Sequence, residues 1–392
     1  MDNKVVKSFI AGVALSGAAV AGPVAGPAEV PSSSGGASPC CVLKSLGSSI
    51  YEGTGFINSI KFSGRAHFNA ASTNGYVDGG GSFSDEYIEL RRFRFGTKVQ
   101  LFNDFTLVAA ADLNKNSSRD DVRFGYKSMD ELYLKYALGN IGGVNDASIS
   151  YGRMKFKFGA EGHTSSNNLK TVERSVIGNS FYNGSRPTGV KFAGKVGGFS
   201  GSLGVFSTDD DSQELDDWND GTAIHGSVSF AAAGGKVILD GLVSDTDGPS
   251  DRQFSKEWAT SAAYQTQVGN WDLVLNALYG KEEQSGDKTY GFVVMPSTFI
   301  IEDKLEFVAR YEYAKSDGDN IGLSRYASDS SSAVIGGTPR GDEHHGIYAG
   351  VNYYLCGDNA KLQLGAEYET LEESTGLEGH ASTFWFGFRS NF

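Results

Sequence analysis

Residues 379–392 read GHASTFWFGFRSNF, and this stretch alternates between two kinds of side chain. Its phenylalanines are two or four residues apart: Phe384, Phe386, Phe388 and Phe392. Arg389 and Asn391 lie between them. Because successive side chains of a strand point to opposite faces, the stretch predicts a β-strand with one aromatic and one polar face.

The same alternation recurs along most of the chain; in 302–315, for example, Phe307 and Tyr311 alternate with Arg310 and Glu312. Sixteen segments follow the pattern: 55–69, 86–102, 105–114, 130–138, 146–154, 187–196, 198–208, 222–233, 236–244, 256–269, 270–281, 287–297, 302–315, 343–356, 359–371 and 379–392. Many exceed the usual five or six residues of a strand. An even number of long strands is typical of a bacterial outer-membrane barrel, and a final aromatic residue in the last strand is what the barrel-assembly machinery recognises.

The connections between these segments fall into two classes. Short joins are Asn103-Asp104, Gly197-Gly198, Gly234-Gly235, Gly269-Asn270 and Gly357-Asp358. Long polar segments are 70–85, 115–129, 155–186, 209–221 and 316–342. Because short turns at one rim and long loops at the other are typical of outer-membrane barrels, we expect an all-β fold, a transmembrane antiparallel β-barrel of about 16 strands.

The composition agrees with a large sheet and excludes two other classes. Glycine makes up 52 of 392 residues, nearly twice the usual share of roughly 7%. The mean hydropathy is −0.27, and no apolar run reaches the roughly 20 residues of a membrane-spanning helix. The net charge of −13 argues against a nucleic-acid-binding surface.

The N-terminus is typical of an export signal. Lys4 and Lys7 precede the short apolar run 9–20, and Ala19-Val20-Ala21 fits a small-residue cleavage site. We therefore expect a signal peptide at 1–21, a Gly/Pro/Ser-rich tether with a short N-terminal segment at 22–54, and a barrel at 55–392 in the cell outer membrane. Cys40, Cys41 and Cys356 are too few for a disulfide framework and leave open a bridge to Cys356 or one between chains.

Several motifs within 151–191 carry a family resemblance. They are YGRMKF at 151–156, FGAE at 158–161, TSSN at 164–167, VERS at 172–175 and RPTGVK at 186–191, followed by Gly194. RRFRFG at 91–96, leading to Asn103-Asp104-Phe105, and GVNYYL at 350–355 add to them. In these motifs the chain resembles the phosphate-selective porin O/P family. The resemblance implies a trimeric barrel of 16 strands in which the long segment after Tyr151 folds into the pore as a constriction. The acidic net charge departs from the family, whose phosphate-selective members line the pore with basic residues.

Basic residues on the polar strand faces are the candidates for lining the pore and binding anions: Lys61, Arg65, Arg92, Arg94, Lys98, Arg153, Lys191 and Lys195. The constriction segment adds Lys155, Lys157, Lys170 and Arg174. Guanidinium groups suit oxyanions because they keep their charge and present a planar fork of donors. The alternative is that these cations form structural pairs across the lumen with Glu306, Glu312, Glu367 and Glu369.

Other sites have weak signals. The chain has neither a Gly-x-Ser-x-Gly elbow nor a His-Glu-x-x-His motif, so we expect no enzyme activity, no cofactor and no metal. The aspartates between 209 and 220 are expected to form a solvated outer loop; the alternative is a divalent-cation site that bridges lipopolysaccharide. The expected partners are outer-membrane lipid and lipopolysaccharide, small ions and solutes, and two further copies in a homotrimer, but no nucleic acid.

The strand pattern and the resemblance together predict a water-filled channel for passive diffusion of small ions and solutes, with a preference for anions such as phosphate. Two alternatives remain: a non-selective general diffusion porin, and a non-conducting structural or adhesive barrel.

Overall fold

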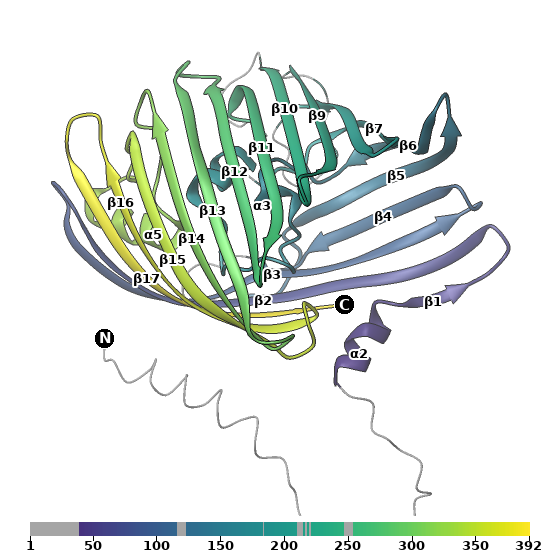
Figure 1. Cartoon of the computed structure of the whole chain (residues 1–392), viewed down its shortest axis with the longest axis horizontal. Coiled ribbons are helices and arrows are strands. Elements are labelled where there is room, and N and C mark those ends of the chain that lie inside the picture. The colour runs from purple at the N-terminus through teal and green to yellow at the C-terminus, as the bar shows by residue number, and fades with distance from the viewer. Residues whose placement is uncertain are drawn as a thin grey trace, which may run out of the picture. The chain divides into compact units, whose positions relative to one another are not determined.

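Sixteen antiparallel strands, β2 to β17, close into a ring in the computed structural model (Figure 1). Each pairs with its neighbour in sequence, and β17 closes the ring on β2, from Gly379 opposite Val77 to Asn391 opposite Arg65. The structure describes residues 39–115, 123–182, 184–209, 215, 218, 221–246 and 254–392. The predicted all-β barrel of 16 strands is confirmed.

The strands are β1 (Ser49–Glu52), β2 (Ile57–Val77), β3 (Gly81–Leu101), β4 (Phe105–Asp112), β5 (Ser128–Ile141), β6 (Val144–Arg153), β7 (Thr188–Val196), β8 (Phe199–Ser207), β9 (Gly221–Ala232), β10 (Gly235–Thr246), β11 (Lys256–Val268), β12 (Trp271–Glu282), β13 (Lys288–Ile301), β14 (Leu305–Ser316), β15 (Glu343–Tyr354), β16 (Ala360–Glu372) and β17 (Glu378–Asn391). The helices are α2 (Pro39–Leu46), α3 (Gly159–His163), α4 (Val176–Tyr182) and α5 (Arg325–Ile335).

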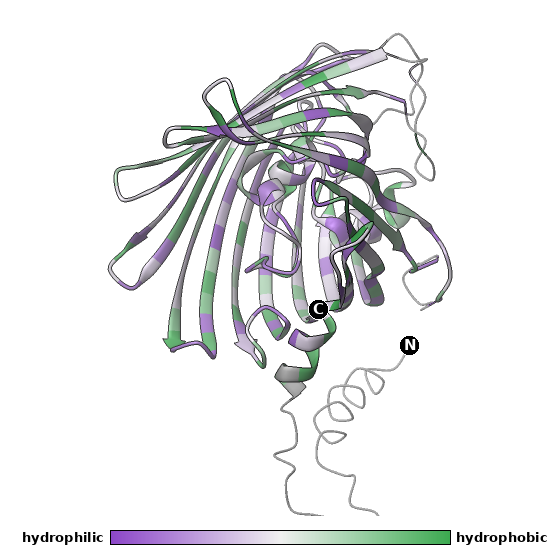
Figure 2. Cartoon of the chain, turned by 90° about the vertical axis from the view of Figure 1, so that its right-hand side faces the viewer, coloured by the Kyte–Doolittle hydropathy of each residue, from purple (hydrophilic) through white to green (hydrophobic). Residues whose placement is uncertain are grey.

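The apolar face of the strands points outward, and the polar face points into the barrel. On β17 the side chain of Phe384 is 61% exposed, whereas that of Arg389 is 1% exposed. On β14, buried Arg310 and Glu312 alternate with partly exposed Tyr311. Figure 2 shows hydrophobic and hydrophilic positions following one another along the strands. This inverted arrangement is what a barrel in lipid requires, because every strand edge is paired and the apolar side chains meet the acyl chains.

One predicted loop is wrong, because most of segment 70–85 belongs to strands. β2 continues to Val77 and β3 begins at Gly81, so that only residues 78–80 form the turn, with Gly79 at a φ of +78°. The outward residues here, such as Ser72 and Asn74, are small and polar, so the sequence shows no apolar alternation. The inward residues Ala71 and Tyr87 belong to the buried apolar core.

Two segments fold into the barrel instead of leaving it. The segment after Tyr151 does so with α3 and α4, as the family resemblance implies. The segment 317–342 also turns inward: α5 packs against β2, β3 and β17, with Tyr326 stacked on Tyr87 at 4.6 Å between ring centroids. We expected a polar loop at 316–342, and its inward helix is a difference from that expectation.

The segment before β2 is attached to the rim of short turns. β1 pairs with Ser59–Lys61 of β2, beyond the part of β2 that β17 covers. A disulfide joins Cys40 of α2 to Cys356 in the β15–β16 turn, which selects one of the two pairings that the sequence left open.

Several predictions concern residues that lie outside the described part of the chain. The signal peptide expected at 1–21 and the tether up to residue 38 lie outside the described residues, as does most of the aspartate-rich run after Asp209. No helix among the described residues has the length and apolar character needed to cross a membrane.

Candidate functional site

A cavity of about 1150 Å³ lies inside the barrel, between the wall and the two inward segments. Among the described residues, twelve cationic side chains line it: Arg65, Arg91, Arg92, Arg94, Lys127, Lys155, Lys157, Arg174, Arg186, Lys191, Arg325 and Arg340. Only three carboxylate residues do so: Glu131, Glu173 and Asp329. The cavity is therefore basic in a chain whose net charge is −13.

The register of β2 and β3 places the basic residues of these strands side by side. Lys61 lies opposite Lys98, and Arg65 lies opposite Arg94, as the predicted common facing requires. A bulge interrupts the pairing after His67, which is opposite Arg92. Because a bulge inserts an extra residue and resets the alternation, both Arg91 and Arg92 face the cavity.

Five of the twelve cations form ion pairs with carboxylates, and three of the five share Asp130 on β5. Arg94, Lys155 and Arg186 all lie within 3.3 Å of a carboxylate oxygen of Asp130. Arg94 also contacts Asp112, and Lys155 contacts Glu131. The pairs fasten the first and last parts of the inward segment to the wall.

The other two pairs involve Glu173 and Glu89. Arg91 Nε lies 2.7 Å from Glu173 Oε1, and Arg325 Nη2 lies 2.7 Å from Glu89 Oε1. Burial raises the pKa of the Glu173 carboxyl, but the charges of Arg91 and Arg92 outweigh it and hold that pKa well below its usual range. Glu173 is therefore a fixed negative charge at neutral pH.

Seven lining cations have no ion pair with a described carboxylate: Arg65, Arg92, Lys127, Lys157, Arg174, Lys191 and Arg340. Arg65 Nη1 donates to Ser166 Oγ at 2.7 Å, and Arg174 donates to the backbone oxygens of Glu161 and Thr164. Arg92 is 7% exposed, and its Nη1 has no hydrogen-bond partner in the described structure. A buried N–H donor without a partner is costly, so Arg92 has an unsatisfied donor among the residues that line the cavity.

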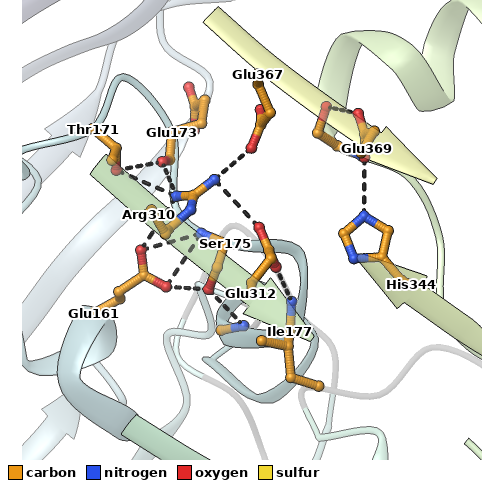
Figure 3. Close-up of polar contacts among 12 residues, drawn as sticks. Glu161, Thr171, Glu173, Ser175, Ile177, Arg310, Glu312, His344, Glu367 and Glu369 are labelled. Atoms are coloured by element: carbon orange, nitrogen blue, oxygen red, sulfur yellow. Dashed lines mark hydrogen bonds and ion pairs between the residues drawn. The ribbon is translucent and has the colours of Figure 1, made fainter. Parts of the chain in front are cut away.

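A second charged cluster holds the inward segments (Figure 3), and Arg310 at its centre is not among the residues that line the cavity. Arg310 on β14 donates to Glu367 Oε1 at 2.5 Å and lies 3.3 Å from Glu312 and 3.6 Å from Glu161. The backbone oxygen of Glu173 accepts a further bond from Arg310 Nη1 at 2.9 Å. One arginine thus connects the wall to the inward segment at Glu161, Thr171 and Glu173.

The neighbouring part of this cluster reaches α5. Glu369 on β16 accepts from Ser324 N at 2.7 Å and from Ser324 Oγ at 2.5 Å, and it lies 3.1 Å from His344 Nε2. Glu312 Oε2 accepts from the backbone of Ile177 at 3.1 Å (Figure 3). Both inward segments are therefore held by carboxylates of one wall region.

Some predicted site residues lie away from the cavity. Lys61 and Lys98 lie on the same faces of β2 and β3 as Arg65 and Arg94, but both are exposed. Lys195 pairs with Asp146 close to a short turn. Arg153 is buried and donates to Met129 O at 2.9 Å. Lys170 pairs with Asp272 and Glu306. The structure brings together the other seven: Arg65, Arg92, Arg94, Lys155, Lys157, Arg174 and Lys191.

The predicted alternative of cross-lumen pairs needs correction. Glu306 pairs with Lys170, Glu312 and Glu367 with Arg310, and Glu369 with His344, so Lys170 is the one predicted cation that they hold. The sequence reasoning missed five cavity residues: Arg91, Lys127, Arg186, Arg325 and Arg340. Arg91 has the wrong parity without the bulge, although it lies in the RRFRFG motif. The other four lie in or beside segments with no period, and of these Arg186 had a signal, inside the RPTGVK motif.

Comparisons with known proteins agree with this architecture. The chain is similar to the outer membrane channel DcaP of Acinetobacter baumannii, with a TM-score of 0.57 and 14% identity over 87% of this chain and 99% of that chain. It is also similar to the outer-membrane-expressed OmpT of Vibrio cholerae, with a TM-score of 0.52 and 12% identity over 85% and 98% of the two chains. At these identities the likeness concerns the fold. A comparison with curated proteins gave no match.

The family comparison covers more than half of the chain. Residues 60–268 match the family described as phosphate-selective porin O and P. The matched range includes the wall strands β2 and β3, the inward segment and Lys191. The chain belongs to the phosphate-selective porin O and P family and is an outer-membrane channel.

Proposed function

We propose that the chain is a passive diffusion channel that prefers small anions, and that the basic cavity sets this preference. The observation that carries the proposal is the imbalance of charge in the cavity, where seven cations have no described carboxylate partner. In a narrow pore with low-dielectric walls, such charges raise the local concentration of anions and lower the barrier to their entry.

The carboxylates of the barrel do not cancel this field, because most of those near the cavity are already paired. Asp130, Asp112 and Glu131 together pair with Arg94, Lys155 and Arg186, and Glu173 pairs with Arg91. Arg65 and Arg92, on adjacent strands, have no ion pair with a described carboxylate, and Arg92 Nη1 is an unused donor for a passing ion. Phosphate and similar oxyanions suit these donors, since guanidinium groups bind them through paired N–H groups.

A general diffusion porin is the second candidate, and the five neutralised cations favour it. In that case paired charges only stiffen the wall, and the channel discriminates by size.

Three further parts of the proposal concern the membrane, the oligomer and export. Outward side chains such as Val243, Ile347 and Phe384, each more than half exposed, are available to outer-membrane lipid, next to lipopolysaccharide at the outer rim. Membership of the family supports a homotrimer, which light scattering of the detergent-purified protein tests by its mass. Loss of residues 1–21 on export is tested by the mass of the mature chain.

A pair of double variants tests the selectivity. In Arg65→Gln with Arg92→Gln, two cavity charges are lost; in Lys61→Gln with Lys98→Gln, two charges are lost from the same strands outside the cavity. In a salt gradient across a planar bilayer, the first variant should shift the reversal potential toward cation selectivity, and the second should stay close to the wild type. Equal shifts in both would assign the preference to the whole lumen and contradict a cavity site.

A further inference from the structure

Within the described ring, β2 and β17 are the one pair of neighbouring strands that is not consecutive in the sequence. Their pairing ends with Asn391 opposite Arg65, and the backbones of Phe392 and Gly64 exchange hydrogen bonds of 3.1 and 3.2 Å. We refer to this pairing as the closing seam. It lacks the turn or loop that connects the two strands of the other pairs, so its own contacts are non-covalent.

β1 continues the closing seam where β17 ends. β3 pairs with one edge of β2 over its whole length, down to Ile57 opposite Leu101. β1 therefore uses the same edge of β2 as β17, and it pairs there with Ser59–Lys61. We refer to residues 39–52, which contain α2 and β1, as the clasp (Figure 1).

The clasp also reaches the other side of the closing seam. A Cβ added to Gly47 would lie 2.8 Å from the backbone carbonyl carbon of Phe392, so these two backbones are in close contact. Cys40 is disulfide-bonded to Cys356 in the β15–β16 turn. The same turn accepts a hydrogen bond of 2.8 Å from the backbone N–H of Asn391 on β17. The clasp is thus attached to β2 on one side of the seam and to the turn that holds β17 on the other.

The disulfide supplies the covalent link that the closing seam lacks. Cys40 precedes β2 in the chain, whereas Cys356 lies between β15 and β16, on the far side of β17. In an open sheet with strands about 4.8 Å apart, β2 and β16 would be separated by roughly 65 Å. A disulfide needs Cα atoms within about 7 Å, and those of Cys40 and Cys356 are 5.1 Å apart. Closure of the ring therefore brings the two cysteines together.

We propose that the clasp locks the closing seam and that its disulfide forms after the ring has closed. The rim of short turns faces the periplasm, where disulfides form. The thiols of Cys40 and Cys356 lose two electrons and two protons as the S–S bond forms, and a disulfide of a periplasmic oxidant is reduced to two thiols. Once bonded, the two sides of an opened seam stay close together and pair again. The inference does not depend on conduction or on a preference for anions.

A refolding time course tests the order of the two events. The Cys41→Ser variant, which keeps Cys40 and Cys356, is refolded from urea into detergent with oxidised glutathione, and samples are alkylated at intervals. Heat-modified mobility on gels reports the closed barrel, and the mass after alkylation reports the bond. We expect the bond in closed barrels, appearing after closure. A Cys40–Cys356 bond that accumulates first in unfolded chains would overturn the proposed order.

Hydrogen exchange of the folded barrel tests the lock itself. The Cys41→Ser variant is compared in its oxidised and reduced forms, and Cys41→Ser with Cys356→Ser is the matched control that cannot form the bond. Reduction should speed exchange roughly tenfold at the backbone amides of β2 and β17 and leave β11 and β12 unchanged, because a short turn joins these two strands. The control should match the reduced form with or without reductant. Equal exchange in the two forms, or a uniform increase in all strands, would overturn the proposal.

Discussion

Arg91 Nε on β3 lies 2.7 Å from Glu173 Oε1 on the inward segment, and Glu173 is 7% exposed. Asn69 Nδ2 on β2 donates to the same oxygen at 2.9 Å. Two wall strands and the inward segment therefore meet at one buried carboxylate. The arrangement neutralises Arg91 and leaves Arg92, the next residue, as a charge available to the cavity.

The Glu173 pair predicts a pH dependence of stability. Because the pKa of Glu173 lies well below its usual range in the folded protein, the unfolded chain takes up the proton first as the pH falls. The stabilisation is complete above about pH 4.5, the ordinary range of a glutamate, and is lost below it. Glu173→Gln should lower the free energy of unfolding in detergent by about 3 kcal/mol at pH 7.

The measurement is the difference between wild type and Glu173→Gln in urea unfolding from pH 7 to pH 3. We expect a constant difference down to about pH 5 and a smaller one below it. A difference that shrinks between pH 7 and pH 5 would show that the carboxylate is not held by Arg91 and Arg92.

Replacing Arg310 should cost more folding stability than replacing a cation at the rim. Arg310→Gln leaves Glu161, Glu312 and Glu367 without their common cation, and removing one partner of a buried charged group costs about 3 kcal/mol or more. Lys315→Gln, on the same strand, removes a partly exposed pair and should cost about 1 kcal/mol or less. Heat-modified mobility on gels ranks the variants, and equal stability of the two would refute a structural role for the Arg310 cluster.

The disulfide predicts a redox effect on stability but not on selectivity. Cys40 and Cys356 are 316 residues apart, and their bond attaches α2 to the β15–β16 turn, away from the cavity lining. Cys40→Ser should lower the free energy of unfolding by about 2–4 kcal/mol, and reductant should do the same to the wild type. The reversal potential should stay the same. A shift in selectivity on reduction would place the N-terminal segment in the permeation path.

The contact between Phe392 and Gly64 predicts that its loss impairs assembly of the barrel. Its backbone exchanges hydrogen bonds of 3.1 and 3.2 Å with Gly64 on β2, and a Cβ on Gly64 would lie 2.4 Å from its ring. Deleting Phe392, or replacing Gly64 with leucine, should reduce the amount of folded barrel in outer-membrane fractions while channels that do insert conduct normally. Normal yield of either variant would contradict a role for this contact in closing the barrel.

The sequence predicts the barrel well because the membrane imposes a simple period. Phe384 and Arg389 differ in exposure as their parity requires, since lipid and lumen impose opposite demands on neighbouring residues. Where the outward residues are small and polar, as at Ser72 and Asn74, the period disappears, and the extension of the strand beyond residue 69 is missed.

The candidate site is less predictable. Arg65 and Arg92 follow from strand parity, but Arg91 faces the cavity only because of a bulge that its sequence does not mark. Which cations form ion pairs depends on partners far away in the sequence, such as Asp130. No local sequence pattern indicates these contacts. The inward helix α5 has no period that separates it from an outer loop.

The sign of the wild-type reversal potential tests the central claim most directly. It is measured across a planar bilayer with a potassium chloride gradient, first near 0.01 M and then near 1 M. The basic cavity predicts anion selectivity that weakens as the Debye length falls from about 30 Å to about 3 Å. A wild-type channel that is cation-selective at low salt would contradict the account, because the seven lining cations that have no ion pair with a described carboxylate would then have no influence on the passing ion.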